Sequence, residues 1–191
     1  MIAVVVFAAA FAVMPMSAFA DGITVGSKLD NFSLSATDGK TYSFNDLKGK
    51  NGIVLVFLSA QCPVVKSYTE RINTLATDYK AKGIAVVGIN SNATEDLAWV
   101  TSNRNENFAE IPVLIDTGNV IADKLGATVT PETFFFDANN TLLYRGAIDN
   151  DRSGENPSEK YLGNAFDLAL AGKKIERTTS KAFGCGIKRK N

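Results

Sequence analysis

Two cysteines are the residues of this sequence best suited to covalent chemistry. Cys62 follows the apolar run from Gly52 to Leu58 and directly precedes Pro63. The run predicts a buried strand, and Pro63 suits the first turn of a helix. Unpaired N–H groups and the dipole at a helix start favour a thiolate, so Cys62 is a candidate nucleophile. The alternative is a structural cysteine that packs as a small apolar residue.

Cys185 lies between Gly184 and Gly186 and is followed by three basic residues, Lys188, Arg189 and Lys190. The glycines predict an accessible thiol, and the nearby cations favour its thiolate. The chain after the last predicted helix is long enough to bring Cys185 to Cys62 of its own chain or of a second copy. An intramolecular disulfide, an intermolecular disulfide and two free thiols are therefore all open. A bonded pair would be either a reactive couple or a static staple worth about 2 to 4 kcal/mol.

Hydrophobic periodicity predicts the elements that position Cys62. Residues 31–44 hold two β-prone runs around Asp38-Gly39, which predicts a hairpin. Residues 52–58 form a continuous apolar run typical of a central strand, and a helix of about five turns starts at Pro63. Residues 84–89 form a second apolar run. Strand, helix and strand in this order predict a right-handed βαβ unit.

The second half of the domain continues the alternation of strands and helices. Six elements are predicted there: a short helix opened by Thr94-Glu95-Asp96, a strand at 112–116, a helix at 119–125 ended by Gly126, the two strands 133–136 and 142–144 of a hairpin around Asn139-Asn140, and a helix at 158–171. The whole pattern predicts an α/β fold with a central mixed sheet flanked by helices and an N-terminal β-hairpin extension.

The two ends of the chain differ from the domain between them. Residues 1–20 carry no charge and end in Ala18-Phe19-Ala20, which predicts a secretory signal, with a retained membrane anchor as the alternative. Residues 21–172 are expected to form one domain. Residues 173–191 are polar and basic, and we expect a flexible tail that carries Cys185. A periplasmic or otherwise extracytoplasmic location follows, where disulfides persist.

Composition excludes several classes of function. The charges of the 20 basic and 20 acidic residues cancel, which disfavours nucleic acid as a partner. We expect contact with a membrane only through the signal segment. The chain has no histidine, so we expect no metal, no cofactor and no Cys-His catalysis. Asp116, Asp137 and Asp149 follow predicted strands, and we interpret them as solvated carboxylates.

Residues 25–172 resemble the thioredoxin-like superfamily. The resemblance is to its redoxin branch, which contains peroxiredoxins (the alkyl hydroperoxide reductase and thiol-specific antioxidant family) and extracytoplasmic thiol-disulfide oxidoreductases. It is carried by the strand IVLVF before Cys62-Pro63, the helix that follows, and Thr130-Pro131 before the strand TFFF. The resemblance implies a thioredoxin-like fold in which Pro131 is cis and faces the reactive Cys62.

The sequence departs from both groups of the redoxin branch. Val65 stands where a CxxC oxidoreductase has its second cysteine, so a local CxxC disulfide is excluded. In the peroxiredoxin pattern, Ser59 fills the hydroxyl position three residues before Cys62 and would hydrogen-bond peroxide. Leu55 replaces the proline of that pattern. The resemblance to peroxiredoxins is therefore partial.

The resemblance also implies an active-site arginine, for which Arg152 is the candidate and Arg145 and Arg71 are alternatives. The sequence then predicts an exported thiol oxidoreductase that reduces peroxides through Cys62, with Cys185 resolving and an exported thiol reductant regenerating both. Exchange with protein disulfides is one alternative, and a non-catalytic, disulfide-stapled binding domain is another. The oligomeric state is open, with a dimer as one option.

Overall fold

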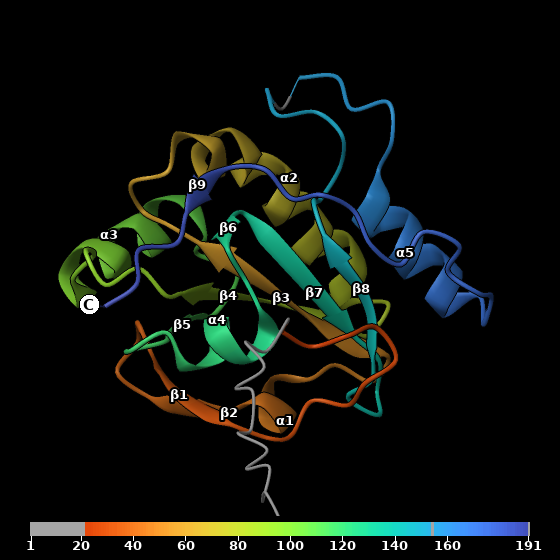
Figure 1. Cartoon of the computed structure of the whole chain (residues 1–191), viewed down its shortest axis with the longest axis horizontal. Helices are drawn as coiled ribbons and strands as arrows, with labels where there is room; N and C mark the ends of the chain where they lie inside the picture. Colours follow the sequence, from red (N-terminus) through yellow and green to blue (C-terminus); the bar gives the residue numbers. More distant parts are fainter. Residues whose placement is uncertain (1–21, 154, 191) are drawn as a thin grey trace, which may run out of the picture.

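A mixed sheet of seven strands forms the centre of the computed structural model, which describes residues 22–153 and 155–190 (Figure 1). Its strands, in spatial order, are β2 (Thr41–Ser43), β1 (Ser33–Ala36), β5 (Val113–Ile115), β4 (Ile84–Asn90), β3 (Gly52–Leu58), β7 (Glu132–Phe136) and β8 (Leu142–Gly146). Neighbouring strands β3, β4 and β5 are parallel, and the other pairs are antiparallel. This confirms the predicted mixed sheet and N-terminal hairpin.

Strand β3 lies in the middle of the sheet because both of its faces are apolar. All seven of its residues are buried. Val54 and Val56 point into one core cluster, while Leu55 and Phe57 point into the other. This alternation is the period of two expected of a strand, and a continuous apolar run is what a strand covered on both faces requires.

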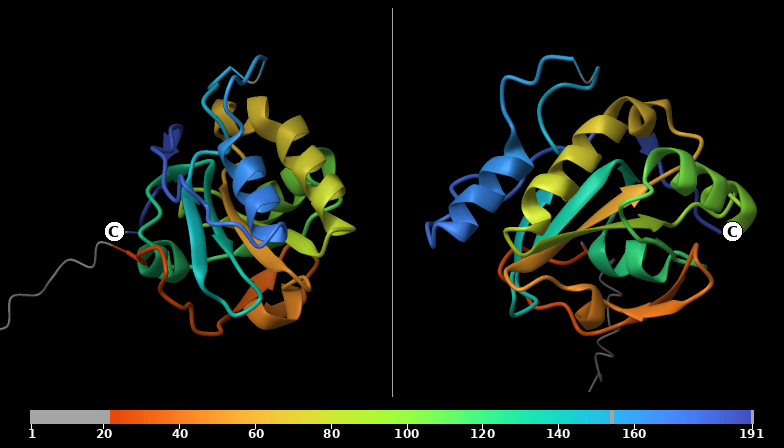
Figure 2. Two further views of the ribbon diagram at one scale, coloured as in Figure 1. Left: turned by 90° about the vertical axis from the view of Figure 1, so that its right-hand side faces the viewer. Right: turned by 180° about the vertical axis from the view of Figure 1, so that it is seen from behind.

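Helices cover both faces of the sheet (Figure 2). One core cluster contains buried residues of α2 (Pro63–Lys80), α3 (Leu97–Asn107) and α5 (Tyr161–Leu170). The other contains Phe44 of α1 (Phe44–Leu47) and three residues of α4 (Val120–Leu125). The layers are therefore helix, sheet and helix, the arrangement of a thioredoxin-like α/β fold.

One helix boundary differs from the prediction, and three short elements escaped it. Helix α5 begins at Tyr161 rather than at Ser158. The side-chain oxygen of Asn150 accepts from the backbone of Ser158 and Glu159, which keeps these residues in the preceding loop. Helix α1 and strands β6 (Val129–Thr130) and β9 (Cys185–Gly186) are too short for a periodic sequence pattern.

Residues 173–190, here called the C-terminal strap, lie packed along the domain, unlike the expected flexible tail. Arg145 on β8 exchanges backbone hydrogen bonds with Thr178 and Ser180, so the strap covers the outer edge of the sheet. Further along, Ile187 is buried. The strap escaped prediction because its apolar residues are isolated, and each fits a different place on the fold.

Residues 1–20, which the sequence predicts to be a secretory signal, lie outside the described residues. Within residues 22–153 and 155–190, the structure contains no helix that is both long and apolar enough to span a bilayer.

Candidate active site

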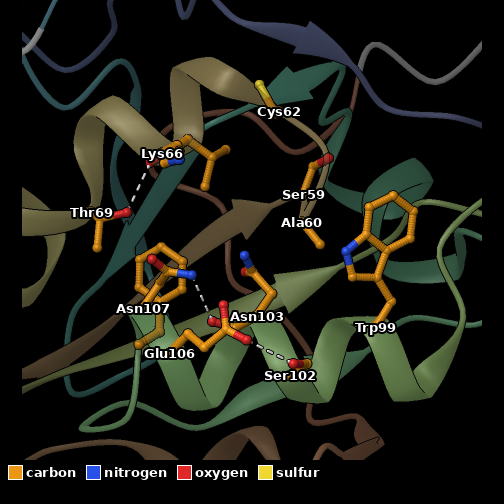
Figure 3. A pocket seen from close by; sticks show the side chains of 12 residues that line it. Ser59, Ala60, Cys62, Lys66, Thr69, Trp99, Ser102, Asn103, Glu106 and Asn107 are labelled. Carbon is orange, nitrogen blue, oxygen red and sulfur yellow. Dashed lines mark hydrogen bonds between the residues drawn. The ribbon is translucent and has the colours of Figure 1, made fainter.

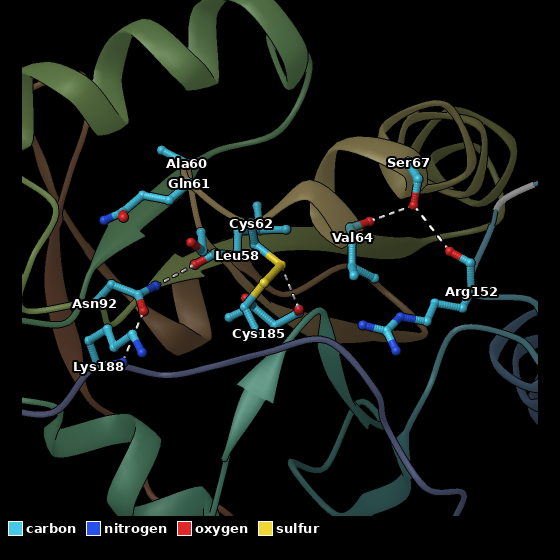
Figure 4. The surroundings of a disulfide bond; sticks show 12 residues. Leu58, Ala60, Gln61, Cys62, Val64, Ser67, Asn92, Arg152, Cys185 and Lys188 are labelled. Atoms are coloured by element: carbon cyan, nitrogen blue, oxygen red, sulfur yellow. Dashed lines mark hydrogen bonds between the residues drawn. A yellow bond between two sulfur atoms is a disulfide. The ribbon is translucent and has the colours of Figure 1, made fainter.

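A disulfide joins Cys62 to Cys185 across a sequence separation of 123, with 5.8 Å between their Cα atoms (Figure 4). Cys62 is the N-cap residue of α2, with Pro63 in the first turn as predicted. Cys185 is the first residue of β9. Of the three thiol arrangements that the sequence left open, the structure shows the intramolecular bond.

The residues around Pro131 hold Cys185 in place. Strand β9 pairs antiparallel with β6, which sets Cys185 opposite Thr130. The Thr130–Pro131 peptide bond is cis, as the resemblance implied, and the Thr130 carbonyl oxygen lies 3.3 Å from Cys62 Sγ. A Cβ atom on Gly184 would lie 1.9 Å from that oxygen, so only glycine permits this close approach. The backbone before Pro131 thus contacts both cysteine segments.

The two cysteines differ in exposure. Cys62 is only 3% exposed, whereas Cys185 is half-buried. A pocket of about 290 Å³ between α2 and α3 touches Cys62, but the Cys62 sulfur points away from it (Figure 3). Trp99, which is 46% exposed, stands at the rim of this pocket. In the disulfide state Cys185 is therefore the more accessible of the two cysteines to an incoming thiol.

Ser59 is buried, and its hydroxyl donates to Glu95 Oε1 at 2.5 Å. Glu95 also accepts from the backbone N–H groups of Ala60 at 2.9 Å and Gln61 at 3.2 Å, and from the Asn90 amide at 2.6 Å. One carboxylate therefore fixes the whole loop that leads into Cys62. Sequence analysis assigned Glu95 only to a helix start, because nothing in the local pattern shows which loop it faces.

The structure separates the three candidate arginines. Arg145 forms an ion pair with Glu132 at 3.5 Å and bonds two carbonyl groups of the domain. Arg71 pairs with Asp149. Arg152 is exposed on the loop after β8, where its backbone carbonyl accepts from Ser67 Oγ at 3.3 Å (Figure 4). Within the described residues the Arg152 guanidinium has no hydrogen bond or ion pair, so no contact ties it to the disulfide.

Two of the aspartates interpreted as solvated are buried, and that interpretation was wrong for them. Asp116 accepts from the backbone N–H groups of Ile121 and Ala122 and so caps α4. Asp149 pairs with Arg71. In both cases the partner that permits burial lies outside the local pattern. Within the described part of the chain, no three His, Cys, Asp or Glu side chains gather as a metal site.

A mixed sheet covered by helices, with a disulfide between a helix N-terminus and a segment facing a cis-proline, defines a thioredoxin-like redox protein. Residues 25–145 match the AhpC/TSA family, and the chain belongs to that family.

Several named proteins are similar to this chain. The thiol:disulfide interchange protein DsbE of Yersinia pestis is 32% identical over 133 residues, which is 67% of each chain. The thiol-disulfide oxidoreductase ResA of Bacillus anthracis is 29% identical over 119 residues, 62% of this chain and 67% of that protein. The crystal structure of a hypothetical protein from Sinorhizobium meliloti matches with a TM-score of 0.81 and 31% identity, covering 88% of this chain and 96% of the other.

The similar proteins and the geometry of the site indicate the same general class of activity. The protein is a thiol-based redoxin oxidoreductase. The named relatives are thiol-disulfide oxidoreductases, which favours the alternative that sequence analysis set beside peroxide reduction.

Proposed function

We propose that this protein exchanges electrons with the disulfides of other proteins through the Cys62–Cys185 couple. The observation that carries the proposal is the disulfide itself. It joins Cys62, at the start of α2, to Cys185 in β9, the strand that pairs with the residues just before Pro131. A second cysteine in this position takes the place of the absent CxxC partner, because either arrangement lets a mixed disulfide be resolved within one chain.

The surroundings of Ser59 support exchange over peroxide reduction. A peroxidase role would require this hydroxyl to donate to peroxide beside Cys62. In the structure the hydroxyl donates to the Glu95 carboxylate instead. Leu55, in place of the proline of the peroxiredoxin pattern, is consistent with this assignment. We therefore give Ser59 a positioning role through Glu95.

The proposed exchange runs in two steps. A thiolate of the exported reductant attacks Cys185 Sγ, which forms a mixed disulfide and breaks the Cys62–Cys185 bond. Cys62 leaves as a thiolate, which the N-terminus of α2 stabilises. The second thiolate of the reductant then attacks its own sulfur in the mixed disulfide and releases Cys185 as a thiol after protonation. The same steps in reverse pass two electrons to a substrate disulfide.

We also propose that the protein works outside the cytosol. The apolar segment 1–20 with its Ala-x-Ala end supports export. A disulfide persists in an oxidising compartment, which also supports this location. Its partners would then be an exported thiol reductant and exported proteins with disulfides.

Exchange and peroxide reduction are separated by giving the reduced protein each substrate in turn. With insulin as a disulfide-bonded probe, we expect faster reduction than with the Cys62→Ser variant. With hydrogen peroxide, we expect wild type and Cys62→Ser to consume it equally slowly. Rapid peroxide loss that depends on Cys62, with insulin untouched, would reject exchange in favour of a peroxidase.

The site of attack is tested with reduced glutathione, which is added briefly to the oxidised protein and quenched by acid. Mass spectrometry then shows which cysteine carries glutathione. We expect the Cys185 adduct to exceed the Cys62 adduct by at least about tenfold, because Cys185 is the less buried of the two cysteines and Cys62 is the better leaving group. A majority of adduct on Cys62 would contradict the proposed order of attack.

A further inference from the structure

Two buried asparagines lie beside the segment that follows Cys185. Asn92, in the loop after β4, is 7% exposed, and Asn119, at the start of α4, is 2% exposed. A buried amide needs hydrogen-bond partners, because leaving one unpaired costs free energy. Each amide donates a hydrogen bond to the domain through its nitrogen and accepts one from the strap through its oxygen.

Asn92 connects the two segments that carry the cysteines. Its Nδ2 donates to the carbonyl oxygen of Leu58 at 3.3 Å, at the end of the strand that leads to Cys62. Its Oδ1 accepts from the backbone N–H of Lys188 at 3.1 Å, three residues beyond Cys185. Figure 4 shows this amide between Leu58 and Lys188. The neighbouring Ala93 N–H donates to the Lys188 carbonyl at 2.9 Å, so two hydrogen bonds hold Lys188 to the loop after β4.

Asn119 fastens the strap two residues further on. Its Nδ2 donates to the Ser91 carbonyl, and its Oδ1 accepts from the backbone N–H of Lys190 at 3.0 Å. Just before Lys188, Ile187 is 8% exposed and donates its N–H to Thr128 O at 2.9 Å. The residues after Cys185 are therefore held by a buried apolar side chain and by the polar bonds that follow it in the chain.

None of these contacts involves a sulfur atom, so opening the disulfide breaks none of them directly. We propose that Asn92 and Asn119 are positioning residues that keep the strap docked in the dithiol state. Cys185 then stays beside Cys62 while the disulfide is open, and the effective concentration of one thiol at the other remains high. The inference rests on the proposed exchange function, because it concerns closure of the same cysteine pair.

Amide hydrogen exchange tests the docking without any redox chemistry. In the Cys62→Ser/Cys185→Ser protein no disulfide can form. We expect the N–H groups of Ile187, Lys188 and Lys190 to exchange at least about tenfold more slowly than in an unstructured peptide. Adding Asn119→Gly should remove most of that protection at Lys190. Exchange of all three amides at unstructured rates in the doubly substituted protein would overturn the proposal.

Closure kinetics test the positioning role. The glutathione adduct of each protein is prepared, and the release of glutathione as the Cys62–Cys185 bond re-forms is followed. We expect Asn119→Gly to slow this step by about tenfold, because loss of strap bonds lowers the docked population. Asn119 has a φ of 62°, a conformation that glycine adopts without strain, so this variant removes the amide and keeps the backbone. Asn92→Ala is expected to slow closure similarly.

Asn73→Ala is the matched control, since the Asn73 amide donates to the Asn107 carbonyl at 2.8 Å and does not touch the strap. We expect its closure rate to equal that of wild type. Unchanged closure in Asn119→Gly would overturn the positioning role. If the strap amides are protected but insulin is not reduced, the exchange function fails while docking stands. If insulin is reduced and the amides are unprotected, the docking inference alone fails.

Discussion

Replacing Cys62 with serine is expected to lower two-electron turnover of a protein disulfide at least about a thousandfold. In the proposed exchange Cys62 supplies the thiolate that the N-terminus of α2 stabilises, and the sequence has no other cysteine to close a disulfide with Cys185. Turnover is measured as insulin reduction with a dithiol reductant. Because Cys185 remains free to react, the variant should accumulate a mixed disulfide on Cys185 that wild type resolves.

Cys185→Ser is the matched control for Cys62→Ser. Both variants lose the disulfide and the stability of about 2 to 4 kcal/mol that such a bond contributes, so their comparison removes that effect. Cys185→Ser should also fail to turn over, but any adduct it forms must sit on Cys62. Near wild-type insulin reduction by Cys62→Ser would show that the reaction does not run through this pair.

Replacing Asp149 with alanine is expected to destabilise the fold by about 3 to 5 kcal/mol, the cost of leaving a buried charge without its partner. The Asp149 side chain is 3% exposed and pairs with Arg71, whose side chain is 17% exposed. Asp149 also accepts the hydroxyl of Tyr68 at 2.8 Å. Burial, followed by this bond to the carboxylate, raises the pKa of Tyr68 above its usual value. The free energy of unfolding in denaturant measures the effect.

Asp167→Ala is the control for Asp149→Ala, because Asp167 makes the same two kinds of contact at the surface. It accepts the Tyr79 hydroxyl at 2.8 Å and lies 3.9 Å from the Lys82 ammonium, with its own side chain 62% exposed. We expect a loss of about 1 kcal/mol or less, since solvent screens the exposed pair. Equal losses in the two variants would refute the special cost of burial at Asp149.

Sequence patterns alone predicted the part of the site built from contiguous residues. The apolar run of β3, Cys62, Pro63 and the first turns of α2 follow one another in the chain. Each pattern reports a local property, namely burial on both faces, helix initiation and a period of three to four residues. The cis-proline came from the resemblance rather than from these patterns, because no local rule places Thr130-Pro131 beside Cys62.

Only the tertiary structure decided which groups hold the two segments that carry the cysteines. Glu95, Asn92 and the strap reach the site from loops far along the chain, and their hydrogen bonds leave no periodic trace in the sequence. The same is true of Asp149, since a carboxylate is buried or solvated according to whether a distant cation reaches it. The sequence by itself placed Cys62 at the start of a helix, and the fold brought Cys185 to it. The physical reason is that a burial pattern depends on neighbouring residues of the chain, whereas the hydrogen-bond and ion-pair partners of a side chain depend on how distant segments pack.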